Sequence, residues 1–230
     1  MLVGFAGKGR AGKSTAAECL VREYGFTTVA LADPIKRALR EIFNFDEDAL
    51  WGDGNRTAPD KRFPLVNGGF LTTRHCMQSL GTFWGRDACY PDVWVDYLLR
   101  IVAKIETGDW HYDRTRGLGQ RLQGALLPLI PEILAEKSEM SRTNGFSTDV
   151  VVPDVRFKNE IDKIHNHGGF VFRINRPGAG LEGEAGKHRS ETEIDECPDS
   201  MFDAIIENVG TMAEFCRNVC NQFVIVKGRN

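Results

Sequence analysis

The sequence predicts an α/β fold in which a parallel central sheet is flanked by helices. Short apolar runs typical of buried strands alternate along the chain with amphipathic runs of helical period. The 230 residues are enough for one large domain with a buried core. A net charge of −3 argues against a large basic surface for nucleic acid. We therefore expect one domain, residues 1–230, built around that sheet.

Each element is expected from a local pattern. Residues 2–6 form a continuous apolar run, and the helix after them ends at Gly25. Asp33-Pro34 opens another helix, because proline is tolerated in the first helical turn. Later elements repeat these two patterns. The expected strands are 2–6, 26–31, 150–154, 169–175 and 204–208, with a short end at 223–226, and the expected helices are 13–24, 33–43, 73–86, 91–106, 159–166 and 211–220.

Three segments rich in Gly, Pro and polar residues show no such period. Residues 44–72 are expected to be irregular, 108–148 to be an insertion with a short helix within 122–137, and 177–200 to be a loop. The apolar run 125–131 is too short and too interrupted by proline to span a bilayer. The sequence thus predicts no membrane association.

Cysteine usage favours a reducing compartment. The six cysteines form no C-x-x-C pair. Cys216 and Cys220 are one helical turn apart, but no third ligand is near in sequence, so we interpret them as free buried thiols rather than a metal site. No basic segment typical of a signal peptide begins the chain. The prediction is a cytoplasmic protein.

A phosphate-binding loop lies between the first expected strand and helix. The pattern G-x-x-x-x-G-K-S needs its glycines so that backbone N–H groups can turn toward phosphate, and the start of the next helix adds a positive dipole. Lys13 is expected to reach the β- and γ-phosphates, and the Ser14 hydroxyl to bind Mg²⁺. The phosphate loop, as we call it, comprises Gly7, Lys8, Gly9, Arg10, Ala11, Gly12, Lys13, Ser14 and Thr15.

A second acidic element follows the expected strand 150–154. Asp154 ends that strand, where ligands of parallel sheets bind, and is expected to hold Mg²⁺ through water. A turn or helix-capping aspartate is the alternative. Arg156, Glu160 and Arg176 follow, and arginines of this kind suit the neutralisation of two anionic substrates. No N-K-x-D base-reading segment of a GTPase is present, so the pattern favours phosphoryl transfer over hydrolysis.

An acceptor site requires further cations and aromatic surfaces. Asp33, Lys36 and Arg37 lie in the first turns of one expected helix. Arg74, Gln78 and Arg86 accompany aromatic residues in the next expected helix. The alternative is that the aromatic residues Phe83, Trp84 and Trp94 belong to the core and the charges to a solvated surface.

Seven motifs in order resemble the deoxynucleoside monophosphate kinases of tailed bacteriophages, which are similar in fold to adenylate and dephospho-coenzyme A kinases. Residues 44–72 and 108–148 lie outside this resemblance. Besides the phosphate loop, the motifs are Leu31 to Lys36, Met77 to Thr82, Val152 to Arg156, Arg176 to Gly178, His188 to Glu191 and Asn208 to Thr211.

The resemblance implies an adenylate-kinase-like P-loop fold with a lid, residues 177–200, and an acceptor-binding region, residues 33–107, which we call the acceptor region. It implies Mg²⁺-ATP as donor, a 5′-deoxynucleoside monophosphate as acceptor, and a homodimer in the host cytoplasm. Arg156 and Arg176 are expected to clamp the transferring group, and Asn208 and Gly210 to lie near the donor adenine, where Val209 replaces a frequent aspartate. The residues expected around the acceptor are Lys36, Arg37, Arg74, Gln78, Gly81, Thr82 and Trp94, with His188 and Glu191 from the lid.

The expected mechanism is in-line attack by an acceptor phosphate oxygen, helped by positioning and charge neutralisation. Trp94 is a candidate for filling the space of a ribose 2′-hydroxyl, and His188 for a lid contact or an unrelated surface position. Two other functions stay open. One is a kinase for another small phosphorylated acceptor such as dephospho-coenzyme A, and the other is a P-loop ATPase without a small acceptor.

Overall fold

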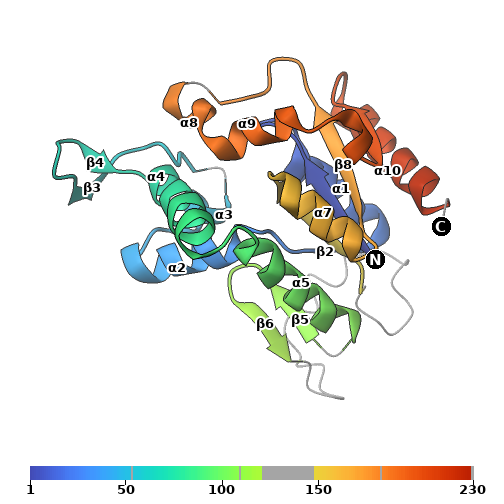
Figure 1. Ribbon diagram of the computed structural model, residues 1–230, viewed down its shortest axis with the longest axis horizontal. Helices are drawn as coiled ribbons and strands as arrows, with labels where there is room; N and C mark the ends of the chain where they lie inside the picture. The colour runs from blue at the N-terminus through green and yellow to red at the C-terminus, as the bar shows by residue number, and fades with distance from the viewer. Residues whose placement is uncertain (53, 109, 121–147, 182, 229–230) are drawn as a thin grey trace.

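A five-stranded parallel sheet forms the centre of the computed structural model, which describes residues 1–52, 54–108, 110–120, 148–181 and 183–228 (Figure 1). The strand order is β2-β7-β1-β8-β9, and each neighbouring pair is parallel. This confirms the predicted α/β fold with a parallel sheet. The strands are β1 (Leu2–Ala6), β2 (Thr27–Thr28), β7 (Val150–Val155), β8 (Phe170–Asn175) and β9 (Ala204–Glu207).

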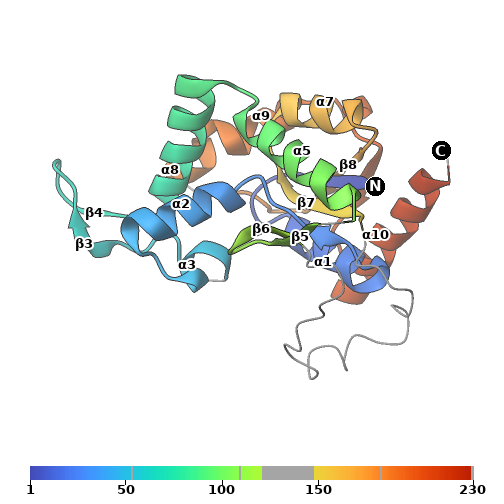
Figure 2. The same ribbon diagram turned by 90° about the horizontal axis from the view of Figure 1, so that it is seen from below.

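Alternating residues of the sheet enter two separate cores. Val150 and Val152 pack with α5 (Val93–Glu106) and α7 (Lys158–Asn166), whereas Val151 packs with the opposite layer. That opposite layer is α1 (Lys13–Tyr24) and α10 (Met212–Lys227), which contact each other as well as the sheet (Figure 2). The strands therefore carry continuous apolar runs because both of their faces are covered.

The acceptor region projects to the left in Figure 1 and has a small core of its own around Ile35, Leu39 and Leu50. The prediction of an irregular segment 44–72 was wrong, because it contains a short helix and a two-stranded hairpin. These elements are too short to show a period, and the hairpin buries little. The elements of the region before α5 are α2 (Asp33–Phe43), α3 (Glu47–Trp51), β3 (Asp60–Pro64), β4 (Phe70–Leu71), α4 (Thr73–Gln78) and η1 (Ser79–Cys89).

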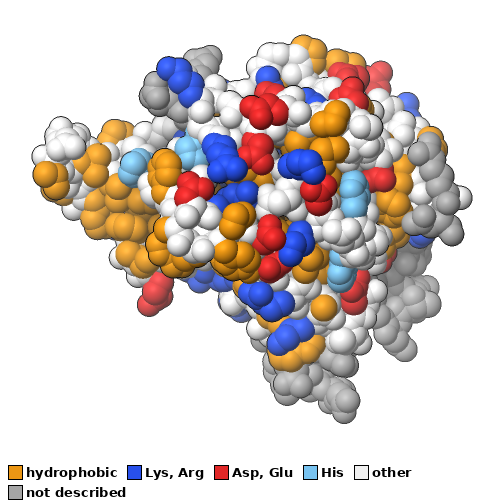
Figure 3. Space-filling view, viewed as in Figure 1, with side chains coloured by type: hydrophobic (Ala, Val, Ile, Leu, Met, Phe, Trp, Pro, Cys, Tyr) orange, Lys and Arg blue, Asp and Glu red, His pale blue; other side chains and the backbone are white. Residues whose placement is uncertain are grey.

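The helix expected over 73–86 continues to Cys89, and its second part, η1, is a π-helix. The Trp94 ring lies where a Cβ at position 85 would be, so a glycine is needed at that crossing. The β3–β4 hairpin exposes apolar side chains, including Leu65, Val66 and Phe70, and Figure 3 shows hydrophobic side chains gathered on that side of the molecule.

The remaining predicted loops also contain structure. The expected insertion begins with the hairpin β5 (Trp110–Asp113) and β6 (Gly117–Gln120). The helix expected within 122–137 lies outside the described residues. The lid forms α8 (Gly183–Lys187), α9 (Arg189–Glu196) and the 3₁₀ turn η2 (Asp199–Met201), which the Gly- and Glu-rich composition concealed. The separate element expected at 223–226 is instead the last part of α10, whose buried residues 215, 219, 223 and 226 keep one helical period.

Cys19 of α1 and Cys216 of α10 form a disulfide across 197 residues. The expectation of a free thiol was therefore wrong for Cys216, because nothing in the local sequence indicates the pairing of the two helices, and Cys220 is free as expected. Within the described part of the chain, no helix combines the length and apolarity that a bilayer span requires.

Candidate active site

The phosphate loop connects β1 to α1 at the carboxyl end of the sheet. Its backbone is left-handed at Gly7 (φ 138°), Arg10 (φ 64°) and Gly12 (φ 102°). A Cβ on Gly7 would lie 2.5 Å from the backbone oxygen of Ile174, and a Cβ on Gly12 would overlap the Asn208 amide. Conformation and space therefore both require these two glycines.

The turn before α10 supports this loop. Asn208 Nδ2 donates a hydrogen bond to the Ala11 backbone oxygen at 2.8 Å, and Gly210 is left-handed (φ 83°). Thr211 caps α10, its hydroxyl accepting from the Glu214 backbone N–H at 3.2 Å. Asn208, expected at the donor nucleotide, thus holds the loop backbone directly.

Lys13 is folded back onto its own loop. Its side-chain nitrogen donates to the backbone oxygens of Gly7 at 2.8 Å and Lys8 at 2.6 Å, and the residue is 7% exposed. Burial, assisted by the nearby Arg156, lowers the pKa of Lys13 to about 7. Ser14 beside it is exposed at the start of α1. The lysine is therefore held where a polyphosphate would restore its charge.

A carboxylate from the lid lies at the phosphate loop. Glu191 Oε2 accepts from the Gly9 backbone N–H at 2.8 Å, and Glu191 Oε1 forms an ion pair with Arg156. Glu191 is only 6% exposed. Burial lowers the pKa of Arg74, and among the charged neighbours of Arg74 the Glu191 carboxylate has the largest effect, which opposes this lowering. The phosphate loop, β7 and the acceptor region therefore supply cations or donors around one anionic group.

The lid is closed over the loop. The Gly180 backbone N–H donates to the Gly9 oxygen at 2.9 Å, and Lys8 pairs with Asp195 of α9 at 3.1 Å. His188 begins α9 by accepting from the Ser190 backbone N–H through Nδ1. Figure 1 shows α8 and α9 running along the top of the molecule above the sheet.

Asp154 anchors the chain that enters the acceptor region. Its two carboxylate oxygens accept from the backbone N–H groups of Leu31 at 2.8 Å and Ala32 at 3.0 Å. Each oxygen keeps a further lone pair. An exposed hydroxyl at Ser14 and a carboxylate of this kind are groups that could hold Mg²⁺.

A cavity of about 340 Å³ opens beside the phosphate loop at the ends of β8 and β9. Arg176 lines this cavity and is exposed. Arg156 does not line the cavity and instead pairs with Glu191. The lining residues are Gly7, Lys8, Ala11, Arg173 to Ala179, Asp195 and Glu207.

Three buried side-chain donors in the acceptor region and the lid have no hydrogen-bond partner among the described residues, namely Gln78 Nε2, Arg86 Nε and His188 Nε2. The His188 ring packs edge-on against Phe83, with 5.8 Å between centroids. Its Nδ1 accepts a hydrogen bond from Ser190, so Nε2 carries the proton, and burial lowers the pKa of His188. Buried donors without a partner are uncommon in folded proteins, so these atoms are candidates for ligand contacts.

The structure corrects the assignment of Asp33 and Arg37 to the acceptor. Asp33 is fully buried and accepts from the Ala30 N–H and from Trp51, Tyr112 and Arg114. Arg37 donates to the Tyr97 and Tyr112 hydroxyls and to the Arg114 backbone oxygen. Both side chains are bound by protein partners, several of them in the β5–β6 hairpin, which they anchor.

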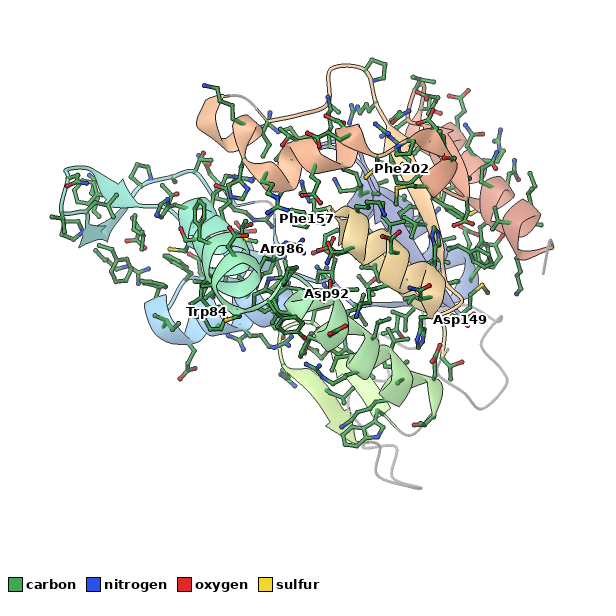
Figure 4. All side chains as sticks on the ribbon, viewed as in Figure 1. Trp84, Arg86, Asp92, Asp149, Phe157 and Phe202 are labelled. Atoms are coloured by element: carbon green, nitrogen blue, oxygen red, sulfur yellow. A yellow bond between two sulfur atoms is a disulfide. The ribbon has the colours of Figure 1, made fainter. Side chains whose placement is uncertain are left out.

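Arg86 and Glu160, also expected at the acceptor, are likewise bound by other parts of the protein. The Arg86 guanidinium lies 3.6 Å from the centre of the Phe157 ring and donates to Asn159 at 2.9 Å (Figure 4). Glu160 accepts from the backbone N–H groups of Arg156 and Phe157, and burial raises its pKa to about 7. These two residues join η1 to α7.

Lys36 and Thr82 are buried, and Trp94 Nε1 donates to the Gly81 backbone oxygen at 2.7 Å. Sequence reasoning missed Tyr112 and Arg114, because they lie in a segment without a clear period. In the sequence, only their residue types, a tyrosine and an arginine, could have indicated a role near the acceptor.

Comparison with known proteins shows similarity along nearly the whole chain. A protein of Acanthamoeba polyphaga mimivirus named "Putative deoxynucleotide monophosphate kinase" is 29% identical over 216 residues, which cover 94% of this chain and 92% of the viral protein. No protein-family model matches the chain. Among solved structures, a dephospho-CoA kinase from Campylobacter jejuni aligns over 98% of this chain and 96% of its own, with 18% identity and a TM-score of 0.37.

Proposed function

We propose that this protein transfers the γ-phosphoryl group of ATP to a 5′-deoxynucleoside monophosphate, giving ADP and the deoxynucleoside diphosphate. The observation that carries the proposal is the group of donors around the Glu191 carboxylate. The Gly9 N–H of the phosphate loop and Arg156, at the end of β7, contact this carboxylate directly, and Arg74 of the acceptor region adds a positive charge that acts on it electrostatically. A site with cations from both sides of a bound phosphate fits transfer between two anions. The similarity to the mimivirus protein supports the same activity.

The chemistry requires little of the protein beyond placement and charge. An oxygen of the acceptor phosphate attacks the γ-phosphorus, a new P–O bond forms, and the bond to the ADP oxygen breaks with its electrons remaining on ADP. The attacking oxygen is already anionic, so no general base is needed. Lys13, Arg74 and Arg156 would neutralise the charge on the transferring group, and the closed lid would exclude water.

The donor would lie along the phosphate loop, with its base toward the cavity that Arg176 lines. Ser14, and Asp154 through water, would hold Mg²⁺, which would neutralise the β- and γ-phosphate oxygens when bound. The loop already binds an anionic oxygen at Gly9, so a phosphate oxygen fits there. Glu191 must leave this position before the donor occupies it.

The acceptor would lie near the end of α4 and the start of α9, where Gln78 and His188 offer unpaired donors. Lys36, Arg74, Gly81 and Thr82 complete the proposed contacts. Trp94 is held by its bond to Gly81 and by its packing on Gly85. Its role in excluding a ribose 2′-hydroxyl stays a prediction, which Trp94→Ala would contradict by leaving the deoxy-to-ribo preference unchanged.

Product analysis tests the proposal. Mg²⁺-ATP is incubated with each of the four common 5′-deoxynucleoside monophosphates, the ribonucleotides, dephospho-coenzyme A, and no acceptor. We expect ADP together with the matching deoxynucleoside diphosphate from at least one deoxynucleotide. The variant Lys13→Met should give no product, which excludes a contaminating kinase. Equal ADP formation without acceptor would contradict the proposal, and so would transfer to dephospho-coenzyme A alone.

A further inference from the structure

The β5–β6 hairpin forms a wall of the acceptor region. Tyr112 of this hairpin donates to Asp33 at 3.2 Å. Arg37 donates to the Arg114 backbone oxygen at 2.9 Å, and Arg40 to the Thr115 backbone oxygen at 2.8 Å. Asp33, Arg37 and Arg40 lie along one side of α2, and Figures 1 and 2 both show the hairpin beside this helix and α5. The hairpin is thus fixed against the start of α2.

Arg114 lies in the turn of this hairpin and faces Asp33. Its Nε is 3.3 Å from both carboxylate oxygens of Asp33, and its side chain is 35% exposed. Asp33 also accepts from the Ala30 N–H and the Trp51 indole, so Arg114 is only one of its partners. Within the described residues, the two terminal nitrogens of Arg114 make no hydrogen bond. The flat outer edge of the guanidinium is therefore available to an anion.

Lys36 is the second cation at this place. It follows Asp33 by one helical turn, is 6% exposed, and its ammonium makes no hydrogen bond or ion pair with the described residues. The ammonium lies 5.8 Å from the centre of the Trp51 ring, and the same Trp51 donates to Asp33. Burial lowers the pKa of Lys36 to about 8, and Arg114 is the charged neighbour with the largest effect. Lys36 thus has carboxylates in the vicinity but no direct anionic partner among the described residues, which favours a bound anion here.

The position of Arg114 and Lys36 relative to the phosphate loop indicates which anion they would bind. Asp154 accepts from the backbone N–H groups of Leu31 and Ala32 just before α2 and acts electrostatically on both Lys13 and Lys36, so the Lys36 site lies on the same side of the sheet as the phosphate loop. We propose that Arg114 and Lys36 bind the phosphate group of the acceptor, with two guanidinium N–H groups directed to phosphate oxygens. This inference rests on the proposed function. The proposal gives the β5–β6 hairpin, which carries Arg114, a direct role in substrate binding.

Binding measured without turnover tests the inference. The enzyme is saturated with Mg²⁺ and a non-hydrolysable ATP analogue, and the deoxynucleoside monophosphate accepted in the product analysis is titrated by calorimetry. Arg114→Ala should raise its Kd by about 10- to 100-fold, because a charge-assisted contact to phosphate is lost. Arg114→Lys should retain part of the affinity. Arg116→Ala, an exposed arginine in the same turn, should change Kd less than about twofold.

Two controls separate phosphate binding from support of the fold. The deoxynucleoside without its phosphate should bind wild type and Arg114→Ala equally. Tyr112→Phe removes one bond to Asp33 but keeps both cations, so its Kd for the monophosphate should stay near the wild-type value. An equal loss in Tyr112→Phe, or equal loss of nucleoside binding in Arg114→Ala, would overturn the inference. Unchanged monophosphate binding in Arg114→Ala would overturn it while the proposed function stands, whereas a wild-type enzyme that binds no monophosphate would contradict both.

Discussion

At the scale of single residues, Glu191 and Lys13 occupy the hydrogen-bonding groups of the phosphate loop before a nucleotide binds. Glu191 occupies the Gly9 N–H and pairs with Arg156, and Lys13 binds the loop's own carbonyl oxygens. The donors and cations that a phosphate would use are thus engaged internally. Nucleotide binding must exchange these contacts for new ones, and two predictions follow from that exchange.

Glu191→Gln should bind a non-hydrolysable ATP analogue about tenfold more tightly than wild type. The amide keeps the shape of the side chain but removes the negative charge that competes with phosphate at Gly9 and Arg156. Calorimetric titration measures the change. Glu196→Gln, at an exposed position at the end of the same helix, is the matched control and should leave the affinity unchanged. Weaker binding by Glu191→Gln would show that the carboxylate assists the nucleotide rather than competing with it.

Binding of Mg²⁺-ATP at pH 8 should take up about one proton at Lys13. The free protein lowers the pKa of Lys13 to about 7, so the amine is mostly neutral at pH 8, and the bound phosphates restore the ammonium. Uptake should be small at pH 6, where Lys13 is already charged. Calorimetry in buffers of different ionisation enthalpy measures the protons. Lys13→Arg stays charged throughout and should remove the uptake; the same uptake in this variant would rule out Lys13 as its source.

At the scale of elements, the closed site depends on how helices are joined. Arg86 of η1 stacks on Phe157 and bonds to Asn159 of α7, while Glu160 of α7 caps its own first turn. The π-helical η1 and the helix after β7 are thereby connected next to the phosphate loop. This connection is made of buried charged groups, so loss of one partner leaves the other unpaired.

Arg86→Met should lower the free energy of unfolding by about 2–3 kcal/mol and leave the acceptor KM unchanged. The methionine still covers the Phe157 ring, but Glu160 loses its cation in a buried place. Chemical denaturation and steady-state kinetics measure the two quantities. Arg217→Met, on the exposed side of α10, should change neither. An increase in acceptor KM without a loss of stability would instead restore Arg86 to the acceptor site.

At the scale of the whole molecule, the disulfide between Cys19 and Cys216 connects the helix after the phosphate loop to the C-terminal helix. Reduction, or the pair of changes Cys19→Ser and Cys216→Ser, should lower the free energy of unfolding by about 2–4 kcal/mol. Thermal unfolding with and without reductant measures this loss. Cys89→Ser, at an exposed free cysteine, is the control and should have no effect.

Alkylation of the unfolded, non-reduced chain checks the bond itself. Cys76, Cys89, Cys197 and Cys220 are free and should be modified, whereas Cys19 and Cys216 should react only after reduction. Modification of all six cysteines without reductant would show that α1 and α10 are joined by packing alone. In that case, reductant should not change the unfolding temperature.

Local sequence was sufficient for the sheet, most helices and the phosphate loop. The run from Leu2 to Ala6 and the glycines at 7 and 12 act through neighbouring residues, so their pattern can be read along the chain. The short elements of residues 44–72 and the lid helices were missed, because elements of a few residues show no period. The reassignment of Asp33, Arg37, Arg86 and Glu160 has another cause. Their residue types suit a ligand, but the partners that occupy them lie on other elements.

The sequence by itself determined that this protein has a parallel α/β core and a phosphate-binding loop, since both depend on residue order over one or two turns of chain. Only the tertiary structure decided which groups surround that loop. The bond from Gly9 to Glu191 joins residues 182 positions apart, and that from Arg114 to Asp33 joins residues 81 apart. Contacts of this kind depend on how whole layers pack, because the side chains that meet are brought together by the sheet order and not by their neighbours in sequence.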